Sequence, residues 1–235
     1  IRYKMITQAW IDTITPPISR GVQSEFHEHD FYSIEMMHQI ASYQVTTVKQ
    51  ERDRAAACFL FLSAMRAQAF VSMPINCVDL QNYQVLQLPQ MGVRTKNRKA
   101  AKTQMLRIPE LLQIVNTWDE KVRRALGPTG LWYASLDQFG AFVPQNPEEV
   151  NWLSRREIMQ KGIRDICELA GVKYLSPHKF RHGHIYYMMG RVQDLKQLKA
   201  LSQNVMHSSV SITDGIYGKL ISDDIKTIYG EISEG

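Results

Sequence analysis

The residues best suited to chemistry lie in one short segment, His178-Lys179-Phe180-Arg181. If the segment is helical, positions i and i+3 share one face, so His178 and Arg181 project together. We expect the helix to begin just before them, at Ser176. That end of a helix carries partial positive charge and binds anions. An imidazole beside a guanidinium there suits a phosphate that must be both held and protonated.

Two further segments, one upstream and one downstream, carry residues that fit the same chemistry. Upstream, Arg66 ends a long apolar stretch, and downstream, His207 precedes Tyr217 by ten residues. Each residue alone has a simpler explanation. An arginine can cap a helix, a histidine can bond to buried backbone, and Tyr217 is one of ten tyrosines, with Tyr229 nearby. The order of the three segments is therefore more informative than any one of them.

The segment from Met91 to Pro109 is strongly basic. It holds six cationic residues and no acidic residue, in a chain whose net charge is +5. The cations are Arg94, Lys96, Arg98, Lys99, Lys102 and Arg107. A solvated basic hairpin would explain this run, and so would a hairpin that contacts nucleic acid phosphates.

Taken together and in this order, the segments resemble the tyrosine site-specific recombinases of the phage integrase family. Members place an arginine after a buried helix, then a His-x-x-Arg-His box, then a Gly-His-Ser-Ser-like segment nine or ten residues before a nucleophilic tyrosine. The matching residues here are Arg66, His178, Arg181, His182, His207 and Tyr217. The resemblance covers roughly residues 31–225, which is most of the chain.

The resemblance implies a role for each matched residue. Arg66 and Arg181 would hold the nonbridging oxygens of a DNA phosphodiester, and Tyr217 would attack the phosphorus to form a 3′-phosphotyrosine. His178 would exchange the tyrosine proton, and His207 would donate a hydrogen bond to a nonbridging oxygen. We expect His182 to pack rather than react. These cationic groups would do the work of a metal, so the resemblance implies no metal ion, no ATP and no other cofactor.

The basic hairpin would supply both DNA contacts and a lysine that protonates the leaving 5′-oxygen. We expect the DNA-binding residues to be Arg94, Arg98, Lys99 and Lys102. For the lysine we prefer Lys96, which follows an expected strand from Met91 to Arg94. Lys102 lies nearer the usual interval before Pro109, and Lys99 lies between, so the choice stays open.

The chain departs from the family pattern at three places. The family often has an acidic residue three positions after the first arginine, and Ala69 stands there. Met206 stands where a glycine usually precedes the histidine of the third box. The lysine hairpin is also longer than usual. The first departure removes a group that would orient Arg66.

The pattern of apolar residues predicts a mainly α-helical domain with one small antiparallel β-sheet. The resemblance implies that this is the catalytic core shared by tyrosine recombinases and type IB topoisomerases. We expect strands at 83–88 and 91–94, paired with a strand at 104–108. Helices are expected from Ser33 as N-cap, over 51–64, over 110–126 and from Ser154 as part of a capping box, with another running from Ser176 to about Gly190.

Residues 1–30 read as a lead-in or linker from a missing N-terminal DNA-binding domain, and 31–235 as the catalytic domain with a C-terminal tail. Cys58, Cys77 and Cys167 are widely spaced and odd in number, which favours structural thiols in a reducing cytoplasm. The resemblance to DNA recombinases implies a protein that is associated with the nucleoid. No apolar stretch is long enough to span a membrane. Through its tail, the domain would form a tetramer on double-stranded DNA, as family members do.

Three rival interpretations remain. A type IB topoisomerase shares the chemistry, although the short Ser-Ser-Val segment before Tyr217 is more similar to recombinases. A catalytically decayed DNA-binding protein is supported only by Ala69. A metal-dependent hydrolase would need ligands, and His27, His29 and Asp30 form the one dense cluster, in a segment that we expect to be solvated.

Overall fold

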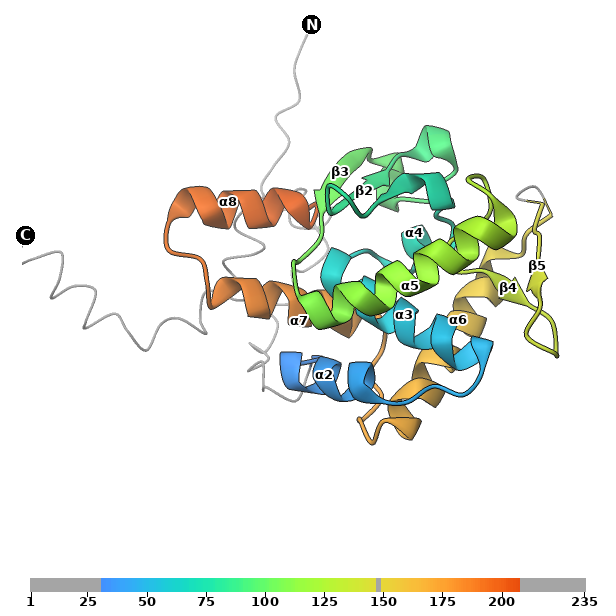
Figure 1. Cartoon of the computed structure of the whole chain (residues 1–235). Coiled ribbons are helices and arrows are strands. Elements are labelled where there is room, and N and C mark those ends of the chain that lie inside the picture. Colours follow the sequence, from blue (N-terminus) through green and yellow to red (C-terminus); the bar gives the residue numbers. More distant parts are fainter. Residues whose placement is uncertain (1–30, 147–148, 208–235) are drawn as a thin grey trace, which may run out of the picture. The chain divides into compact units, whose positions relative to one another are not determined.

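The computed structural model describes residues 31–146 and 149–207, and the following account concerns these residues (Figure 1). The helices are α2 (Ile34–Ser42), α3 (Val48–Ser63), α4 (Ala67–Val71), α5 (Pro109–Leu126), α6 (Trp152–Leu169), α7 (His178–Met189) and α8 (Leu195–Asn204). One sheet has the order β1-β2-β3 (Val78–Asp79, Gln84–Gln87, Ala101–Gln104), and β4 (Ser135–Leu136) pairs with β5 (Phe142–Val143). All pairs are antiparallel.

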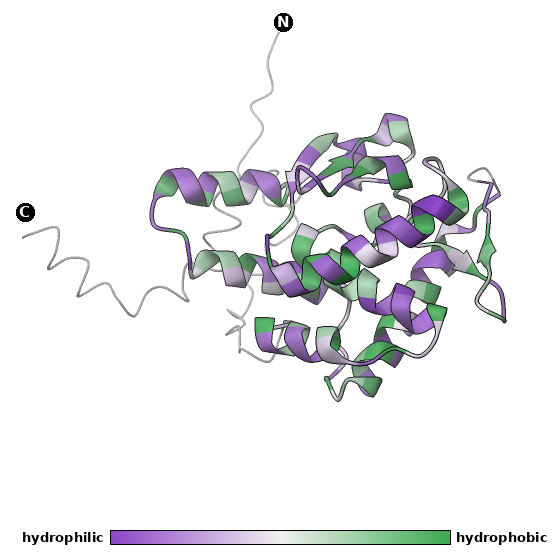
Figure 2. Cartoon of the chain, in the orientation of Figure 1, coloured by the Kyte–Doolittle hydropathy of each residue, from purple (hydrophilic) through white to green (hydrophobic). Residues whose placement is uncertain are grey.

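Helix α3 is the central element of the domain. Every residue from Ala55 to Ser63 is buried, so this helix has no solvent-facing side along that stretch. Helices α2, α5, α6 and α7 pack around it (Figure 1). Helix α5 is amphipathic, with Leu111, Val115 and Trp118 buried, and its hydrophobic and hydrophilic stripes are visible in Figure 2. A central helix that is buried on all sides in its C-terminal half and surrounded by other helices is the expected core of such a domain.

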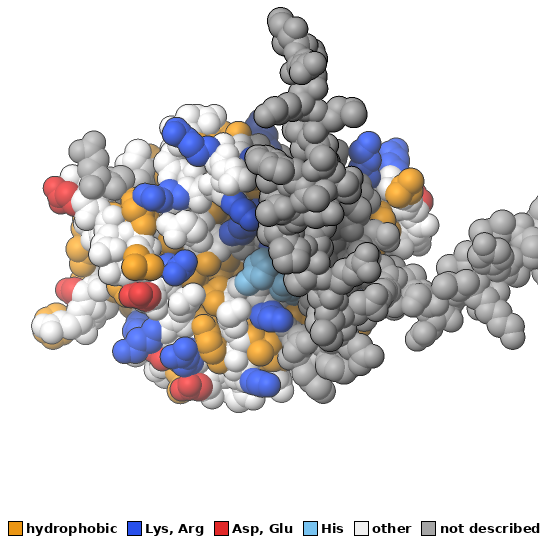
Figure 3. Space-filling view, turned by 180° about the vertical axis from the view of Figure 1, so that it is seen from behind, with side chains coloured by type: hydrophobic (Ala, Val, Ile, Leu, Met, Phe, Trp, Pro, Cys, Tyr) orange, Lys and Arg blue, Asp and Glu red, His pale blue; other side chains and the backbone are white. Residues whose placement is uncertain are grey.

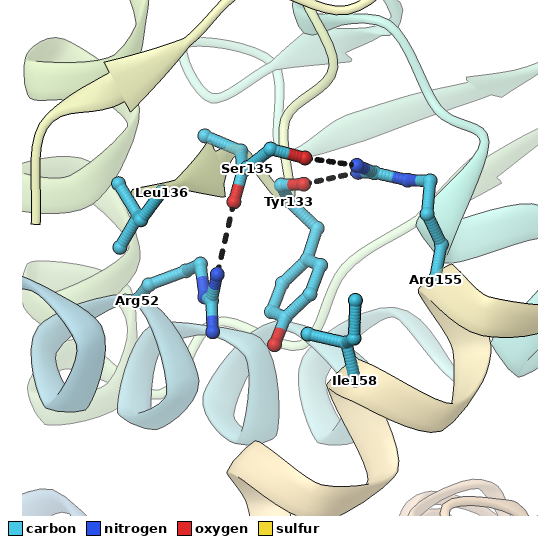
Figure 4. A pocket seen from close by; sticks show the side chains of 7 residues that line it. Arg52, Tyr133, Ser135, Leu136, Arg155 and Ile158 are labelled. Carbon is cyan, nitrogen blue, oxygen red and sulfur yellow. Dashed lines mark hydrogen bonds between the residues drawn. The ribbon is translucent and has the colours of Figure 1, made fainter. Parts of the chain in front are cut away.

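Buried charges join the N-terminal half of α3 to its neighbours (Figure 4). Arg52 Nε donates to Asp53 at 2.9 Å, and the Tyr133 hydroxyl donates to the same carboxylate at 2.7 Å. Arg155 of α6 donates to Ser135 at 2.8 Å and to the carbonyls of Val71 and Tyr133. Arg52, Tyr133, Ser135 and Arg155 are among the residues that line a pocket of about 60 Å³. Because both arginines donate hydrogen bonds to other groups of the protein, this cluster has a structural role.

A close backbone contact fixes the position of α7. The Tyr32 ring stacks on Phe180 at 3.8 Å, and its hydroxyl donates to the Leu175 carbonyl at 2.6 Å. The backbone of Tyr32 passes so near the helix that a Cβ on Gly183 would lie 2.0 Å from the Tyr32 carbonyl oxygen. Only glycine fits there, so the segment before α2 and the helix that carries His178 are locked together.

Most of the expected helices are confirmed. Ser33 caps α2 and accepts from the Met36 N–H at 3.3 Å, and the helices expected over 51–64 and 110–126 are α3 and α5. Two expected caps are wrong. Helix α6 begins at Trp152 with Asn151 as N-cap, and α7 begins at His178 without a side-chain cap from Ser176.

The expected strand register is wrong in the basic hairpin. The strand expected at 83–88 is β2, but residues 91–94 form no strand. The partner strand β3 spans Ala101–Gln104 rather than 104–108, and Leu86 pairs with Lys102. Met105, Leu106 and Ile108 are apolar because they pack on the core and not because they lie in a strand. The second small sheet, β4–β5, was not expected.

The close contact at Gly183 predicts that Gly183→Ala destabilises the domain by about 2–4 kcal/mol, since the added methyl meets backbone rather than a flexible side chain. The free energy of unfolding by urea measures this. Gly190→Ala at the end of the same helix is the matched control, because its nearest neighbour would lie 4.0 Å away. Equal stability of the two variants would contradict the packing described.

Candidate functional site

Arg66 follows the turn that ends α3. The turn depends on Ala64, which adopts a left-handed conformation (φ 52°) and caps the helix with its N–H on the Leu60 carbonyl. Arg66 is half-buried, and its guanidinium makes no hydrogen bond to another described residue. Partial burial lowers the pKa of its guanidinium. An anion bound at Arg66 would compensate this charge, because a desolvated cation without a partner is unfavourable.

Arg181 brings the three sequence segments together. It is buried on α7, and its guanidinium donates to the carbonyl of Ala64 at 3.0 Å and to the carbonyl of Val205. Ala64 lies two residues before Arg66, and Val205 lies two residues before His207. One side chain therefore holds the first arginine and the last histidine beside the His-x-x-Arg box. We call this pair of hydrogen bonds the Arg181 clamp.

His207 is positioned by the end of α8. Its N–H donates to the Ser202 carbonyl at 3.0 Å, and Met206 before it adopts a left-handed conformation (φ 56°). A glycine, as the family pattern has there, would adopt this conformation with less strain. The departure at Met206 thus costs some stability but leaves the turn intact.

The charged groups next to His178 and His207 are cations. Desolvation, followed by the charges of Arg181 and Arg66, lowers the pKa of His207 to about 4. The pKa of His178 is lowered by the same causes. Both imidazoles are therefore neutral at neutral pH, and the permanent positive charge resides on the two arginines. The site combines fixed cations with neutral groups that can accept or donate a proton.

His182 and His184 have different roles. The His182 ring lies edge-on to His178, with ring centroids 4.6 Å apart, and desolvation followed by the charge on His178 lowers its pKa to about 4. His184 is buried and donates from Nδ1 to the Phe61 carbonyl at 2.8 Å, near the end of α3. Sequence reasoning missed His184, because a third histidine in the box gives no local signal of what it bonds to.

The basic hairpin reaches this site through β3. The Leu106 N–H donates to the Leu62 carbonyl, at 2.8 Å, close to the turn before Arg66. Lys102 lies within β3 and is exposed, whereas Lys96 and Arg98 belong to the short 3₁₀ helix η4 (Lys96–Arg98) in the connection between β2 and β3. The register on which we preferred Lys96 is therefore wrong, although the choice among the lysines stays a prediction.

The expected DNA-binding residues Arg94, Arg98, Lys99 and Lys102 are all exposed. The Arg94 guanidinium lies over the Trp152 ring, 5.4 Å from its centroid. In the space-filling view, lysine and arginine side chains lie around the histidines that reach the surface (Figure 3). Ala69 is buried, so no acidic group stands at that position to orient Arg66.

Some expected residues cannot be placed. Tyr217 and the rival Tyr229 lie outside the described residues, and so do His27, His29 and Asp30. Within the described part of the chain, no group of three or more histidine, cysteine, aspartate or glutamate side chains could hold a metal ion. No described helix is long and apolar enough to cross a membrane.

Comparison with known proteins agrees with the arrangement of these boxes. The family model described as "Phage integrase family" matches residues 33–222, a span that contains Arg66, the His-x-x-Arg box, His207 and Tyr217. The chain belongs to the phage integrase family. The family that the sequence motifs indicated is thus confirmed. None of the curated proteins matches the chain.

Solved structures of recombinases share this fold. The XerA recombinase superposes with a TM-score of 0.56 at 17% identity, covering 86% of this chain and 64% of its own. XerH bound to its difH substrate superposes with a TM-score of 0.54 at 16% identity, and the match covers 80% of this chain and 50% of XerH. An integrase from mycobacterium phage Brujita superposes with a TM-score of 0.51 at 16% identity, and the match covers 80% of this chain and 52% of the integrase. The expected fold class is confirmed, and the chain spans less than two thirds of these relatives.

The buried His184 predicts an acid-sensitive fold. Burial, with the Arg181 charge as a smaller cause, holds the pKa of His184 at about 4 in the folded protein, against about 6.5 in an unfolded chain. The unfolded state therefore takes up the proton first, and stability falls as pH drops below about 6.5. This residue alone should account for about 2 kcal/mol of lost stability at pH 5.

His184→Asn tests the prediction, because asparagine keeps an N–H donor near the Nδ1 position and does not titrate. The free energy of unfolding should fall less between pH 7 and pH 5 in this variant than in the wild type. His38→Asn on the exposed side of α2 is the matched control for replacing a histidine by asparagine. Parallel curves for the wild type and His184→Asn would show that His184 is not the group responsible.

Proposed function

We propose that this chain is the catalytic domain of a site-specific DNA recombinase or integrase that cuts and rejoins DNA strands through a covalent link to Tyr217. The observation that carries the proposal is the cluster of Arg66 and Arg181 with the neutral histidines His178 and His207. Negative charge builds on the nonbridging oxygens when a phosphodiester is attacked. Fixed cations that stabilise this charge usually make the largest contribution to such a reaction.

The two arginines would differ in their contributions. Arg66, whose side chain makes no hydrogen bond to another described residue, would offer its planar guanidinium to two phosphate oxygens at once. Arg181 is fixed by the Arg181 clamp and would add charge at a constant position. Neither group loses its proton at any physiological pH, so the electrostatic stabilisation does not depend on titration.

The neutral histidines would handle protons. His178 is exposed at the start of α7, and in its neutral form it can accept the phenol proton as the Tyr217 oxygen attacks phosphorus. His207 in its neutral form still carries one N–H, which would bond a nonbridging oxygen. The P–O5′ bond breaks, a lysine of the basic hairpin protonates the leaving oxygen, and the 3′-phosphotyrosine retains the phosphoester for rejoining. No metal ion or ATP takes part in this scheme.

Double-stranded DNA is the proposed partner. XerH has been solved in pre-cleavage and post-cleavage complexes with difH DNA, and the family match extends that chemistry to this chain as a proposal. Arg94, Arg98, Lys99 and Lys102 would contact the DNA backbone. Such a protein would act at the nucleoid, in the cytoplasm.

The remaining domain assignments are also proposals. Residues 31–235 would form the catalytic domain with its tail, and residues 1–30 would lead in from a DNA-binding domain. Ile221, Ile225, Ile228 and Ile232 lie outside the described residues and would dock the tail on a neighbouring protomer, giving a tetramer on DNA.

Covalent trapping tests the central proposal. The chain is incubated in EDTA with a pool of nicked duplexes of randomised sequence, in which the short cleaved strand diffuses away and prevents rejoining. The wild type should form an SDS-resistant adduct with a subset of the pool, which also identifies the site. Tyr217→Phe should form none, and Tyr229→Phe should behave as the wild type. An adduct that depends on Tyr229 would overturn the assignment, and a wild type that binds DNA without any adduct would favour a decayed enzyme.

A substrate that needs no proton on its leaving group can show which lysine donates that proton. The structure gives a reason to prefer Lys102 over Lys96, because Lys102 lies in β3, the strand that is tied to the segments of Arg66 and His207. A substrate with sulfur at the bridging 5′ position expels a thiolate, which needs no proton. Cleavage by Lys102→Ala should be slow on the oxygen substrate and near normal on the sulfur substrate. Rescue of Lys96→Ala instead would return the role to Lys96.

A further inference from the structure

The side chain of Asn204 forms two hydrogen bonds to one peptide unit of the hairpin. Its Oδ1 accepts from the Gln104 N–H at 2.6 Å, and its Nδ2 donates to the Gln104 carbonyl at 3.0 Å. This is the pattern by which one strand pairs with another. The primary amide of Asn204 thus acts as a one-residue strand, and we call the two bonds the Asn204 staple. It joins residues that are 100 positions apart.

The staple uses an edge that the sheet leaves open. Strand β3 is the outer strand of the sheet, and Gln104 lies opposite Gln84. Because the Gln104 N–H and carbonyl both go to Asn204, this pair is of the type that exchanges no hydrogen bonds across the ladder. The alternation repeats every two residues, so Lys102 turns its backbone to the same edge and its side chain to the same face as Gln104.

The other end of the staple is rigidly linked to His207. Asn204 is the last residue of α8. The turn after it is closed by the Met206 N–H on the Gln203 carbonyl at 2.9 Å, and by the His207 N–H on the Ser202 carbonyl at 3.0 Å. The Arg181 clamp holds Val205 between them. A displacement of β3 relative to α8 is therefore a displacement relative to His207 and Arg181.

We propose that Asn204 is a positioning residue for the cleavage of a DNA strand, because the Asn204 staple fixes the position of the basic hairpin relative to His207. The inference rests on the proposed function, in which that lysine protonates the leaving oxygen. The bond from Leu106 to Leu62 holds the chain to α3 two residues beyond the end of β3, and it does not involve the outer edge of the strand itself. Without the staple, β3 keeps its pairing with β2, but its outer edge can move away from the site. A displacement of about 1 Å can slow a reaction roughly 100-fold.

The variants are chosen to separate positioning from stability. Asn204→Ala removes both bonds, while Asn204→Asp has the same shape and keeps the acceptor for the Gln104 N–H but sets a second oxygen against the Gln104 carbonyl. Both bonds are near solvent, so the fold should survive either change. Gln203→Ala is the matched control, since its exposed side chain precedes Asn204 on the same helix.

The experiment uses the full chain and the nicked duplex recovered by covalent trapping, in an oxygen and a 5′-bridging sulfur version. On the oxygen substrate, both Asn204 variants should form the adduct about 10- to 100-fold more slowly than the wild type. On the sulfur substrate, which needs no proton donor, they should be within about threefold of it. Gln203→Ala should match the wild type on both. Amide hydrogen exchange should be faster at Gln104 in Asn204→Ala and unchanged in α3.

The outcomes are distinct. A defect of equal size on both substrates would overturn the inference, because Asn204 would then act through His207 or through general stability. Normal rates on the oxygen substrate, or unchanged exchange at Gln104, would overturn it as well. A wild type that forms no adduct with any duplex refutes the proposed function itself and is recognised before the variants are compared.

Discussion

The arrangement of the site depends on the buried guanidinium of Arg181. Removing a charged group from water is costly unless it is well hydrogen-bonded. Two of the acceptors of Arg181 lie at helix ends. Ala64 and Val205 are the C-caps of α3 and α8, where unpaired carbonyls give the helix end a partial negative charge. Two helix ends thus stabilise one cation, and each places a site residue two positions further along.

This arrangement makes Arg181 a structural group as well as a proposed catalytic one. Replacing it would leave two helix ends without their donor, and the segments of Arg66 and His207 would separate. Loss of activity in such a variant would combine both effects. Arg66 is the better probe of phosphate contact, because its side chain makes no hydrogen bond to another described residue. Its half-buried guanidinium is orientated without the acidic residue that Ala69 replaces.

The sequence predicted what is local and missed what is long-range. Periodic apolar residues and caps located α2, α3 and α5, and the His-x-x-Arg spacing placed His178 and Arg181 on one helix. The register of β3 failed because Met105 and Leu106 are apolar for packing on the core, which periodicity does not distinguish from a strand. The Arg181 clamp and the Asn204 staple join residues that are 117 and 100 positions apart, and no local pattern indicates such bonds.

The elements of the site are fixed in place to different degrees, and these differences match the role that the proposed chemistry gives to each element. Helix α7 is fixed by the Gly183 contact, and its Arg181 fixes the two helix ends, so the groups that would stabilise the transition state are preorganised. The outer edge of β3, where Lys102 lies, is held more weakly, because the two near-solvent bonds from Asn204 are the ones that join it to the rest of the described domain. A lysine on such a strand can be placed or withdrawn without disturbing the arginines. Proton delivery, rather than phosphate binding, is then the step that is easiest to modulate in this fold.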